Sequence, residues 1–245
     1  MSQSKQSRPG GAPPPRQNSL PAILSAAAVV VLLLGLILML VGNRGGTAAV
    51  APTAAPFAAA PTAGAAAADV AARNDKYKAQ GAPPLAIDPK KSYTATITTP
   101  RGDIVVKLRP DLAPQTVNSF VFLSKEGFYN GVTWHRVLQN FMAQGGDPTG
   151  TGTGGPGYTV PDEFTTQVKF DKPGLLAMAN TGRPNSGGSQ FFITTAPADY
   201  LDGKYTIFGQ VEQGQDIVNG IPLRDPDQNP TTPGEQIVKI TIAES

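Results

Sequence analysis

A run of 22 residues without a charged side chain, at positions 20–41, limits what this chain can fold into more than any other feature of its sequence. A helix needs about 20 apolar residues to cross a hydrocarbon core, so the run predicts a membrane-spanning helix over residues 20–41. Lys5, Arg8 and Arg16 precede the run, whereas only Arg44 follows it closely. The positive-inside rule therefore predicts a single-pass protein of the cell membrane, with a cytoplasmic basic tail at 1–19 and the remainder outside the cytoplasm.

A cleaved signal peptide is the alternative interpretation of this run. The apolar core of a signal peptide usually spans only about 7 to 15 residues, so the length favours an uncleaved anchor. Small residues at 47–49 could nevertheless be cut, which would give a secreted protein. A bacterial lipoprotein anchor is excluded because no Cys follows the span.

Residues 42–91 are rich in Ala, Pro and Gly and contain few large apolar side chains. Such a composition cannot repay the conformational entropy that folding costs, so we expect a disordered linker. Its four lysines near the end, at 76, 78, 90 and 91, could touch anionic lipid, but solvation of the linker is the simpler expectation.

The remaining residues, 92–245, are expected to form one folded domain, and composition narrows its function. They carry eleven basic and fifteen acidic residues, a net charge of −4, which argues against a nucleic-acid partner. The whole chain contains no Cys and a single His, His135. Disulfides, thiol nucleophiles, and zinc or iron–sulfur sites built from Cys or clustered His are thereby excluded.

Short alternating segments with frequent turn residues predict an all-β domain. Residues 93–99 and 104–108 form a predicted hairpin, whose turn contains the Arg-Gly-Asp triplet at 101–103. Pro114, with Gly127 beyond it, predicts a helix that covers one end of the sheet, and a second helix is expected at 214–219. Six further strands complete a nearly closed antiparallel sheet, within residues 132–138, 140–146, 174–180, 189–195, 206–211 and 236–242.

The glycines at 150–155 match the G-x-G-x-x-G pattern of dinucleotide-binding proteins. That pattern requires a helix directly afterwards, but Pro156 and Gly157 follow, and the chain has no βαβ repeat. We therefore interpret this segment as a mobile glycine-rich loop.

Two segments contain polar residues that a hydrophobic core does not explain. In the first, Arg136 and Gln144 stand among large apolar residues, and alternation predicts that Arg136, Leu138 and Asn140 share one face. The second joins residues 176–180 to residues 188–193 through a polar loop. Together they could line a groove with an apolar pocket from Phe141, Met142 and Phe192 beside a fixed cation and amide donors.

Residues 93–243 resemble the cyclophilin family of peptidyl-prolyl cis-trans isomerases, and the short loops suggest a bacterial member. The resemblance rests on four stretches in the family's order and spacing, namely F-M-A-Q-G-G-D at 141–147, M-A-N at 178–180, G-S-Q-F-F-I at 188–193 and L-D-G-K at 201–204. It implies an eight-stranded antiparallel barrel capped by two helices, with the active groove on its outer face. It also implies that X-Pro bonds rotate without a metal or cofactor, and that the partners are proline-containing polypeptides.

The resemblance also assigns roles to individual residues. It places the catalytic arginine at Arg136. Strand alternation, independently, predicts that His135 points away from Arg136 and is a hydrogen-bonded structural residue. The substrate-binding positions would be Phe141, Met142, Gln144, Ala179, Asn180, Thr181, Gln190, Phe192, Tyr200, Leu201 and Tyr205.

Three positions depart from the family pattern. Tyr200 replaces a frequent Trp, Tyr205 replaces a usual His, and Arg183 lengthens the loop between Asn180 and Gln190 by one residue. Because Tyr200 lacks the indole N–H, the resemblance implies weak binding of cyclosporin. Activity should be tuned rather than lost.

The expected protein is a membrane-tethered, monomeric isomerase that assists the folding of extracytoplasmic proteins. The alternative from another class is a noncatalytic module that binds proline-containing peptides in the same groove. An arginine at position 136 favours the enzyme, because binding alone does not require a cation there.

Overall fold

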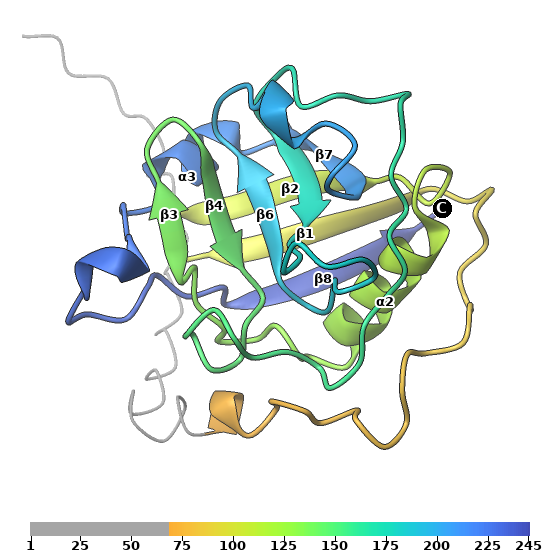
Figure 1. The fold of residues 1–245 in the computed structure, drawn as a ribbon, viewed down its shortest axis with the longest axis horizontal. Coiled ribbons are helices and arrows are strands. Elements are labelled where there is room, and N and C mark those ends of the chain that lie inside the picture. The colour runs from red at the N-terminus through yellow and green to blue at the C-terminus, as the bar shows by residue number, and fades with distance from the viewer. Residues whose placement is uncertain (1–68) are drawn as a thin grey trace, which may run out of the picture. The chain divides into compact units, whose positions relative to one another are not determined.

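The computed structural model describes residues 69–245, which contain eight strands, the helices α2 and α3, and a short helical stretch at 69–71 (Figure 1). The strands are β1 Tyr93–Thr99, β2 Gly102–Leu108, β3 Arg136–Leu138, β4 Met142–Gly145, β5 Leu175–Met178, β6 Phe191–Thr194, β7 Ile207–Gln213 and β8 Lys239–Glu244. The helices are α2 Pro114–Lys125 and α3 Gln215–Gly220, with short 3₁₀ turns at Asp199–Leu201 and Pro226–Gln228.

All eight strands belong to one antiparallel sheet in the order β3-β4-β6-β5-β7-β2-β1-β8. The all-β fold with helices at its margins is confirmed as a curled, eight-stranded sheet. Its edge strands, β3 and β8, do not pair with each other as strands. Hydrogen bonds between the segments that precede them tie the two edges together, including those from the Gly131 N–H to the Ile237 carbonyl and from the Ile237 N–H to the Val132 carbonyl, both 2.7 Å.

The strand expected at 132–138 is shorter than its alternation indicates, because its two halves pair with different partners. Trp134 donates its backbone N–H to the Glu235 carbonyl at 2.8 Å, whereas β3 pairs with β4. Asn140 lies beyond β3 with a positive φ of 53°. It is therefore a turn residue, and the prediction that it shares a strand face with Arg136 and Leu138 is wrong.

Helix α2 begins and ends at its sequence signals. Pro114 occupies the first turn, where its missing N–H costs no hydrogen bond, and Gly127 takes the left-handed conformation beyond the last turn with φ +67°. The buried face of α2 includes Val117, Phe120 and Leu123, which enter the main hydrophobic core. Helix α3 starts one residue later than predicted and contributes Val218 to the same core.

Strands β5 and β6 bury side chains on both faces, which explains their nearly continuous apolar sequences, and β4 does so at all positions except the half-buried Gln144. Ala143, Leu176, Phe191 and Ile193 point into the main core, the inner cluster. Met142, Leu175, Ala177 and Phe192, from the alternate positions, belong to a second set, the outer cluster. The sheet therefore supports two separate hydrophobic clusters, one on each face.

Residues 69–91 differ from the expected disordered linker. They run along the outside of the sheet before entering β1, as the orange to gold ribbon in Figure 1 shows. Tyr77 is only 4% exposed and packs in the inner cluster, with its ring 5.1 Å from that of Phe122 between centroids. The expectation of a free tether is wrong for this part. Burial of the Tyr77 ring stabilises the packed position of the segment, although its composition as a whole is only weakly apolar.

The predicted cytoplasmic tail, the predicted membrane helix at 20–41 and the first part of the predicted linker lie outside the described residues. Within residues 69–245, none of the helices combines the length and the hydropathy that a membrane crossing requires.

Candidate functional site

Arg136 lies at the start of β3, where the sheet presents it beside Gln144. The two residues are direct partners in the β3–β4 ladder, and Gln144 is in turn the partner of Phe192 on β6. Directly opposed residues of an antiparallel sheet share a face, so a cation, an amide and an aromatic ring stand in one row. The guanidinium carbon of Arg136 is 5.9 Å from the centre of the Phe141 ring, within the range of a cation–π contact.

The charge of Arg136 is left uncompensated by carboxylates. Within residues 69–245, the ion pairs join other arginines and lysines to acidic groups, and none includes Arg136. Its side chain is half-buried, so part of its hydration is already removed. A cation held in this way is available to a ligand that offers an electron pair.

The apolar residues predicted for the pocket gather in the outer cluster. Met142, Phe192 and Leu201 are 1%, 4% and 6% exposed, and Phe141 and Tyr205 pack at the margin. Tyr205 meets Phe192 edge to face, with ring centroids 5.5 Å apart. The structure thus brings the predicted apolar residues together next to Arg136, as the groove requires.

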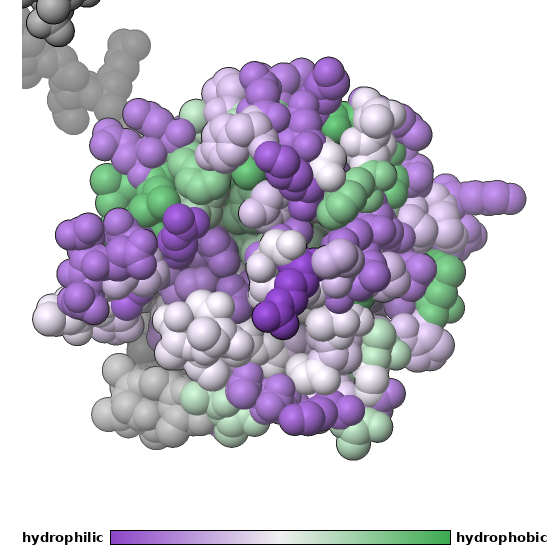
Figure 2. Space-filling model, in the orientation of Figure 1, coloured by the Kyte–Doolittle hydropathy of each residue, from purple (hydrophilic) through white to green (hydrophobic). Residues whose placement is uncertain are grey.

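One face of the described domain can be seen in the space-filling view (Figure 2), and it is not continuously apolar. Figure 2 shows green, apolar patches interrupted by purple, polar residues on the face turned to the viewer. Tyr200 stands at the edge of the outer cluster, 61% exposed, with its ring centroid 5.8 Å from that of Phe141. Tyr200 therefore lies at the rim of the outer cluster.

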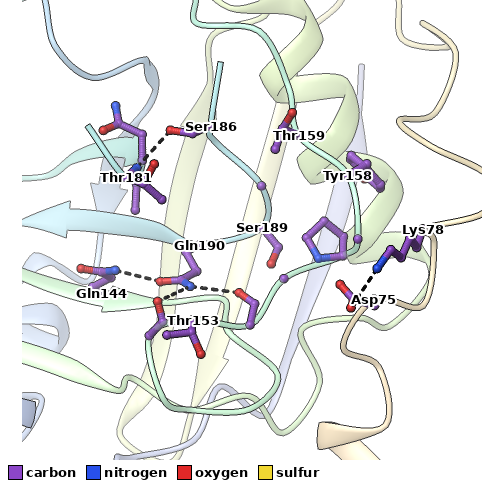
Figure 3. Close-up of a pocket in the computed structure, with 18 residues that line it drawn as sticks. Asp75, Lys78, Gln144, Thr153, Tyr158, Thr159, Thr181, Ser186, Ser189 and Gln190 are labelled. Atoms are coloured by element: carbon purple, nitrogen blue, oxygen red, sulfur yellow. Dashed lines mark hydrogen bonds and ion pairs between the residues drawn. The ribbon is translucent and has the colours of Figure 1, made fainter. Parts of the chain in front are cut away.

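The predicted amide residues belong to a different depression, which we call the hollow. It has a volume of about 610 Å³ and is lined on one side by Gln144, Ala179, Asn180, Thr181 and Gln190. The Gln144 side-chain amide donates to the side-chain carbonyl of Gln190 at 3.0 Å (Figure 3). The predicted apolar residues do not line this hollow. The predicted residues therefore form two groups, the outer cluster and the lining of the hollow, which meet where Gln144 pairs with Phe192 in the sheet.

Gln190 links the groove to the glycine-rich loop. Its side-chain amide donates to the carbonyls of Gly152 and Gly154 at 2.9 and 3.0 Å. Asn180 is held as well, because its amide donates to the Lys204 carbonyl at 2.9 Å and its oxygen accepts from the Gly182 N–H at 3.0 Å. Both side chains are therefore fixed before any ligand arrives.

The glycine-rich loop is folded around one buried carboxylate, that of Asp147. It accepts from the N–H groups of Thr149, Thr151 and Gly152 and from the Thr149 hydroxyl. Burial acts to raise the pKa of Asp147, but these hydrogen bonds to the charged form outweigh it, and the net shift is downward. No helix follows the loop, which confirms that its glycine pattern is not a dinucleotide-binding turn.

His135 is buried behind the same loop, near Gly152. Neither ring nitrogen has a hydrogen-bond partner among the described residues, so the expected hydrogen-bonded histidine is not found. Burial lowers the pKa of His135, which keeps the ring neutral at neutral pH. Its enclosed position is that of a core residue, and its orientation away from Arg136 stays a prediction.

Several residues of the site gave no signal in the sequence. Phe170 stacks on Phe192 with ring centroids 6.0 Å apart, although it comes from an irregular segment with no strand pattern. Asp75 and Lys78, from the expected linker, line the far side of the hollow. Only tertiary contacts bring these residues to the site.

Within the described part of the chain, no group of three or more His, Asp or Glu side chains could hold a metal ion. The groups that the site offers are an unpaired guanidinium, fixed amides and an apolar surface. Such a site can bind an extended polypeptide and polarise one of its amide groups, but it has no nucleophile or proton-transfer pair.

Known proteins similar to this chain share its fold and are described as peptidyl-prolyl cis-trans isomerases. The model of the cyclophilin type peptidyl-prolyl cis-trans isomerases matches residues 94–243. Peptidyl-prolyl cis-trans isomerase B of Streptomyces anulatus is 45% identical over 161 residues, which cover 59% of this chain and 91% of that protein. Peptidyl-prolyl cis-trans isomerase A of Mycobacterium tuberculosis is 46% identical over 174 residues, which cover 63% and 94%.

Among solved structures, a cyclophilin type isomerase of Cryptosporidium parvum aligns with a TM-score of 0.58 at 34% identity. The alignment covers 63% of this chain and 99% of that one. The matched family model, the curated relatives and the curled sheet agree, so the chain belongs to the cyclophilin family and is a peptidyl-prolyl cis-trans isomerase.

Proposed function

We propose that the protein is a membrane-tethered cyclophilin that accelerates X-Pro rotation in polypeptides outside the cytoplasm, with Arg136 as its catalytic residue. The observation that carries the role of Arg136 is its place in the row Arg136, Gln144 and Phe192, next to the outer cluster and without a carboxylate partner. A solved relative was crystallised in the presence of the dipeptide Ala-Pro. We extend this ligand class, proline-containing peptides, to the present chain.

The chemistry follows from the amide bond. Rotation about an X-Pro bond is opposed by about 18 to 20 kcal/mol, because the nitrogen lone pair is shared with the carbonyl group. As the bond twists, the lone pair becomes localised on nitrogen, and Arg136 can donate a hydrogen bond to it there. This interaction is stronger in the twisted state than in the planar one, which is the condition for catalysis.

The remaining residues hold the substrate on either side of the rotating bond. Phe141, Met142, Phe192 and Leu201 would enclose the proline ring, while Gln144 and Asn180 would bind the neighbouring backbone. Because the amides are already fixed by hydrogen bonds to Gln190 and Lys204, little ordering is needed on binding. Rotation is then confined to one bond, with no covalent intermediate.

The test of Arg136 uses the full chain in detergent and follows cis-to-trans exchange of a short X-Pro peptide by NMR. Arg136→Ala should lower the catalysed exchange rate at least about tenfold, since removal of one transition-state donor typically costs a factor of 100 to 1,000. Arg109→Ala is the matched control, because Arg109 is paired with Asp111 at 2.7 Å and lies outside the outer cluster.

Two results would contradict this proposal. Equal exchange rates in the native and Arg136→Ala proteins would remove Arg136 from the mechanism. Peptide binding by the native protein without faster exchange would favour the noncatalytic binding module.

The membrane tether and the orientation rest on the sequence alone. Fractionation of cells that express the full chain should recover an uncleaved protein in the membrane. Protease added outside the cytoplasmic membrane should degrade the domain. A shortened, soluble product would instead identify a cleaved and secreted isomerase.

A further inference from the structure

Residues 69–81, which we call the strap, precede the part of the chain that the family model matches, residues 94–243. The strap nevertheless lies against the domain at two places, one near the end of α2 and one at the glycine-rich loop. These contacts suggest a role beyond connecting the domain to the preceding residues.

The first contact anchors the strap. One guanidinium nitrogen of Arg73 donates to the carbonyls of Gly127, Phe128 and Asn130, just beyond α2. Tyr77 inserts its ring into the inner cluster, where it meets Phe122 and also packs near Tyr158. The buried Tyr77 ring and the three hydrogen bonds donated by Arg73 together fix this segment in one position.

The second contact reaches the glycine-rich loop. The backbone N–H groups of Asp75 and Tyr77 donate to the carbonyls of Gly155 and Pro156, at 3.0 and 2.8 Å. The Asn74 side chain in turn accepts from the Gly155 N–H at 2.9 Å. Three hydrogen bonds therefore tie the strap to residues 155 and 156 of this loop.

The strap approaches the glycine-rich loop so closely that a side chain at position 157 of the loop would have no space. Gly157 has a φ of +94°, and a Cβ atom there would come within 2.9 Å of three Lys78 atoms. Glycine thus suits both the backbone conformation and the contact with the strap.

The strap also supplies part of the hollow itself. Figure 3 shows Gln144 and Gln190 on one side of the hollow and Asp75 and Lys78 on the other. The Lys78 ammonium lies 4.0 Å from the Asp75 carboxylate, too far for a direct hydrogen bond, and both side chains are largely exposed. These charged groups can therefore turn toward a bound ligand.

We propose that the strap completes the substrate groove. By anchoring the glycine-rich loop, it positions the Gly152 and Gly154 carbonyls that hold Gln190 in the wall of the hollow. Its own Lys78 and Asp75 form the outer wall of the hollow. The hollow would receive a polar side chain of the polypeptide near the proline, so the strap determines affinity for extended substrates. This inference rests on the proposed function of the groove.

The experiment compares two ligands on the full chain in detergent. One is a blocked Ala-Pro dipeptide, which is long enough only for the outer cluster, and the other is a hexapeptide with a central proline and polar flanking residues. Dissociation constants and exchange rates for both are measured by NMR. Tyr77→Ala should weaken hexapeptide binding about fivefold or more, equivalent to the loss of about one hydrogen bond, and should leave dipeptide binding within about twofold.

Tyr77→Phe is the matched control, because it keeps the buried ring and should bind both peptides as the native protein does. If Tyr77→Ala does not fold, the double variant Asn74→Ala, Lys78→Ala removes one loop contact and part of the wall without removing a core residue. It should weaken the hexapeptide about twofold to threefold and spare the dipeptide.

The proposal is overturned if a folded Tyr77→Ala protein binds the hexapeptide normally, or if both peptides weaken equally. In the second case the strap would only stabilise the domain. Failure of the proposed function has a separate signature, because the native protein would then accelerate exchange of neither peptide.

Discussion

The two faces of strands β4, β5 and β6 bury apolar side chains for different purposes. On the inner face, Phe191 is fully buried, and its ring meets Phe120, Tyr129 and Trp134 at centroid distances of 5.5 to 5.7 Å. On the outer face, Phe192 packs on Phe170 and Tyr205 but lies beside Gln144, which pairs on its other side with Arg136. One strand therefore contributes adjacent residues to the fold and to the site, and burial alone does not distinguish them.

The largest expected effect is on the inner face. Phe191→Ala should lower the free energy of unfolding by about 3 to 5 kcal/mol, because it opens a cavity among packed aromatic rings. Denaturant unfolding measures this loss. Activity per folded molecule should stay near the native value, and a strong loss of activity in the folded variant would break the distinction between the faces.

Phe192→Ala tests the neighbouring residue on the outer face. We expect peptide affinity to fall at least about tenfold, because the proposed wall against the proline ring is removed, while stability falls less than in Phe191→Ala. An NMR titration with an X-Pro peptide, paired with denaturant unfolding, checks both quantities. Native affinity in this variant would place the proline elsewhere.

A third prediction concerns how stability depends on pH, through two titratable groups at the glycine-rich loop that borders the site. The pKa of His135 is lowered below the ordinary value of 6.5, so the unfolded state binds more protons near pH 6. The contribution of His135 to the free energy of unfolding should therefore be fully present above about pH 7. It should decrease as the pH falls below 6.5 toward the lowered pKa of His135. The pKa of Asp147 is also lowered, from 3.8, so a second loss should follow in more acidic solution.

Melting temperatures between pH 3 and pH 8 measure these two steps. His135→Gln should remove the step near pH 6 and retain the acidic one, because the chain contains no other His. An unchanged profile near pH 6 would mean that His135 is protonated equally well in the folded and unfolded states.

The smallest effect is expected at the rim. Tyr200 is mostly exposed, so Tyr200→Ala should change stability by less than about 0.5 kcal/mol and peptide affinity by about twofold. A tenfold loss of affinity would instead show that Tyr200 closes over the bound peptide. The boundary of the outer cluster would then need to include it.

Much of the secondary structure could be predicted from local signals. Alternation and turn residues placed β1 and β2, and Pro114 with Gly127 placed α2, because these patterns act over a few neighbouring residues. The segment at 132–138 was harder, since its halves pair with different parts of the chain, near Glu235 and with β4. Local alternation does not report where a strand changes its partner.

Of the candidate site, the sequence could predict only the residues that belong to the four motif stretches or stand at positions assigned by the resemblance. By itself, the sequence determined the strand segments, the helices, the absence of thiol chemistry and, by resemblance, the residues placed around Arg136. Alternation implies that Phe191 and Phe192 point to opposite faces of a strand. Only the tertiary structure decided which of the two faces the inner cluster, and that Phe170 supports Phe192. It also decided that the segment around Tyr77, which the sequence presents as linker, lies against the glycine-rich loop. Such contacts join residues that are far apart in the chain, and a local sequence pattern carries no information about the energies of these contacts.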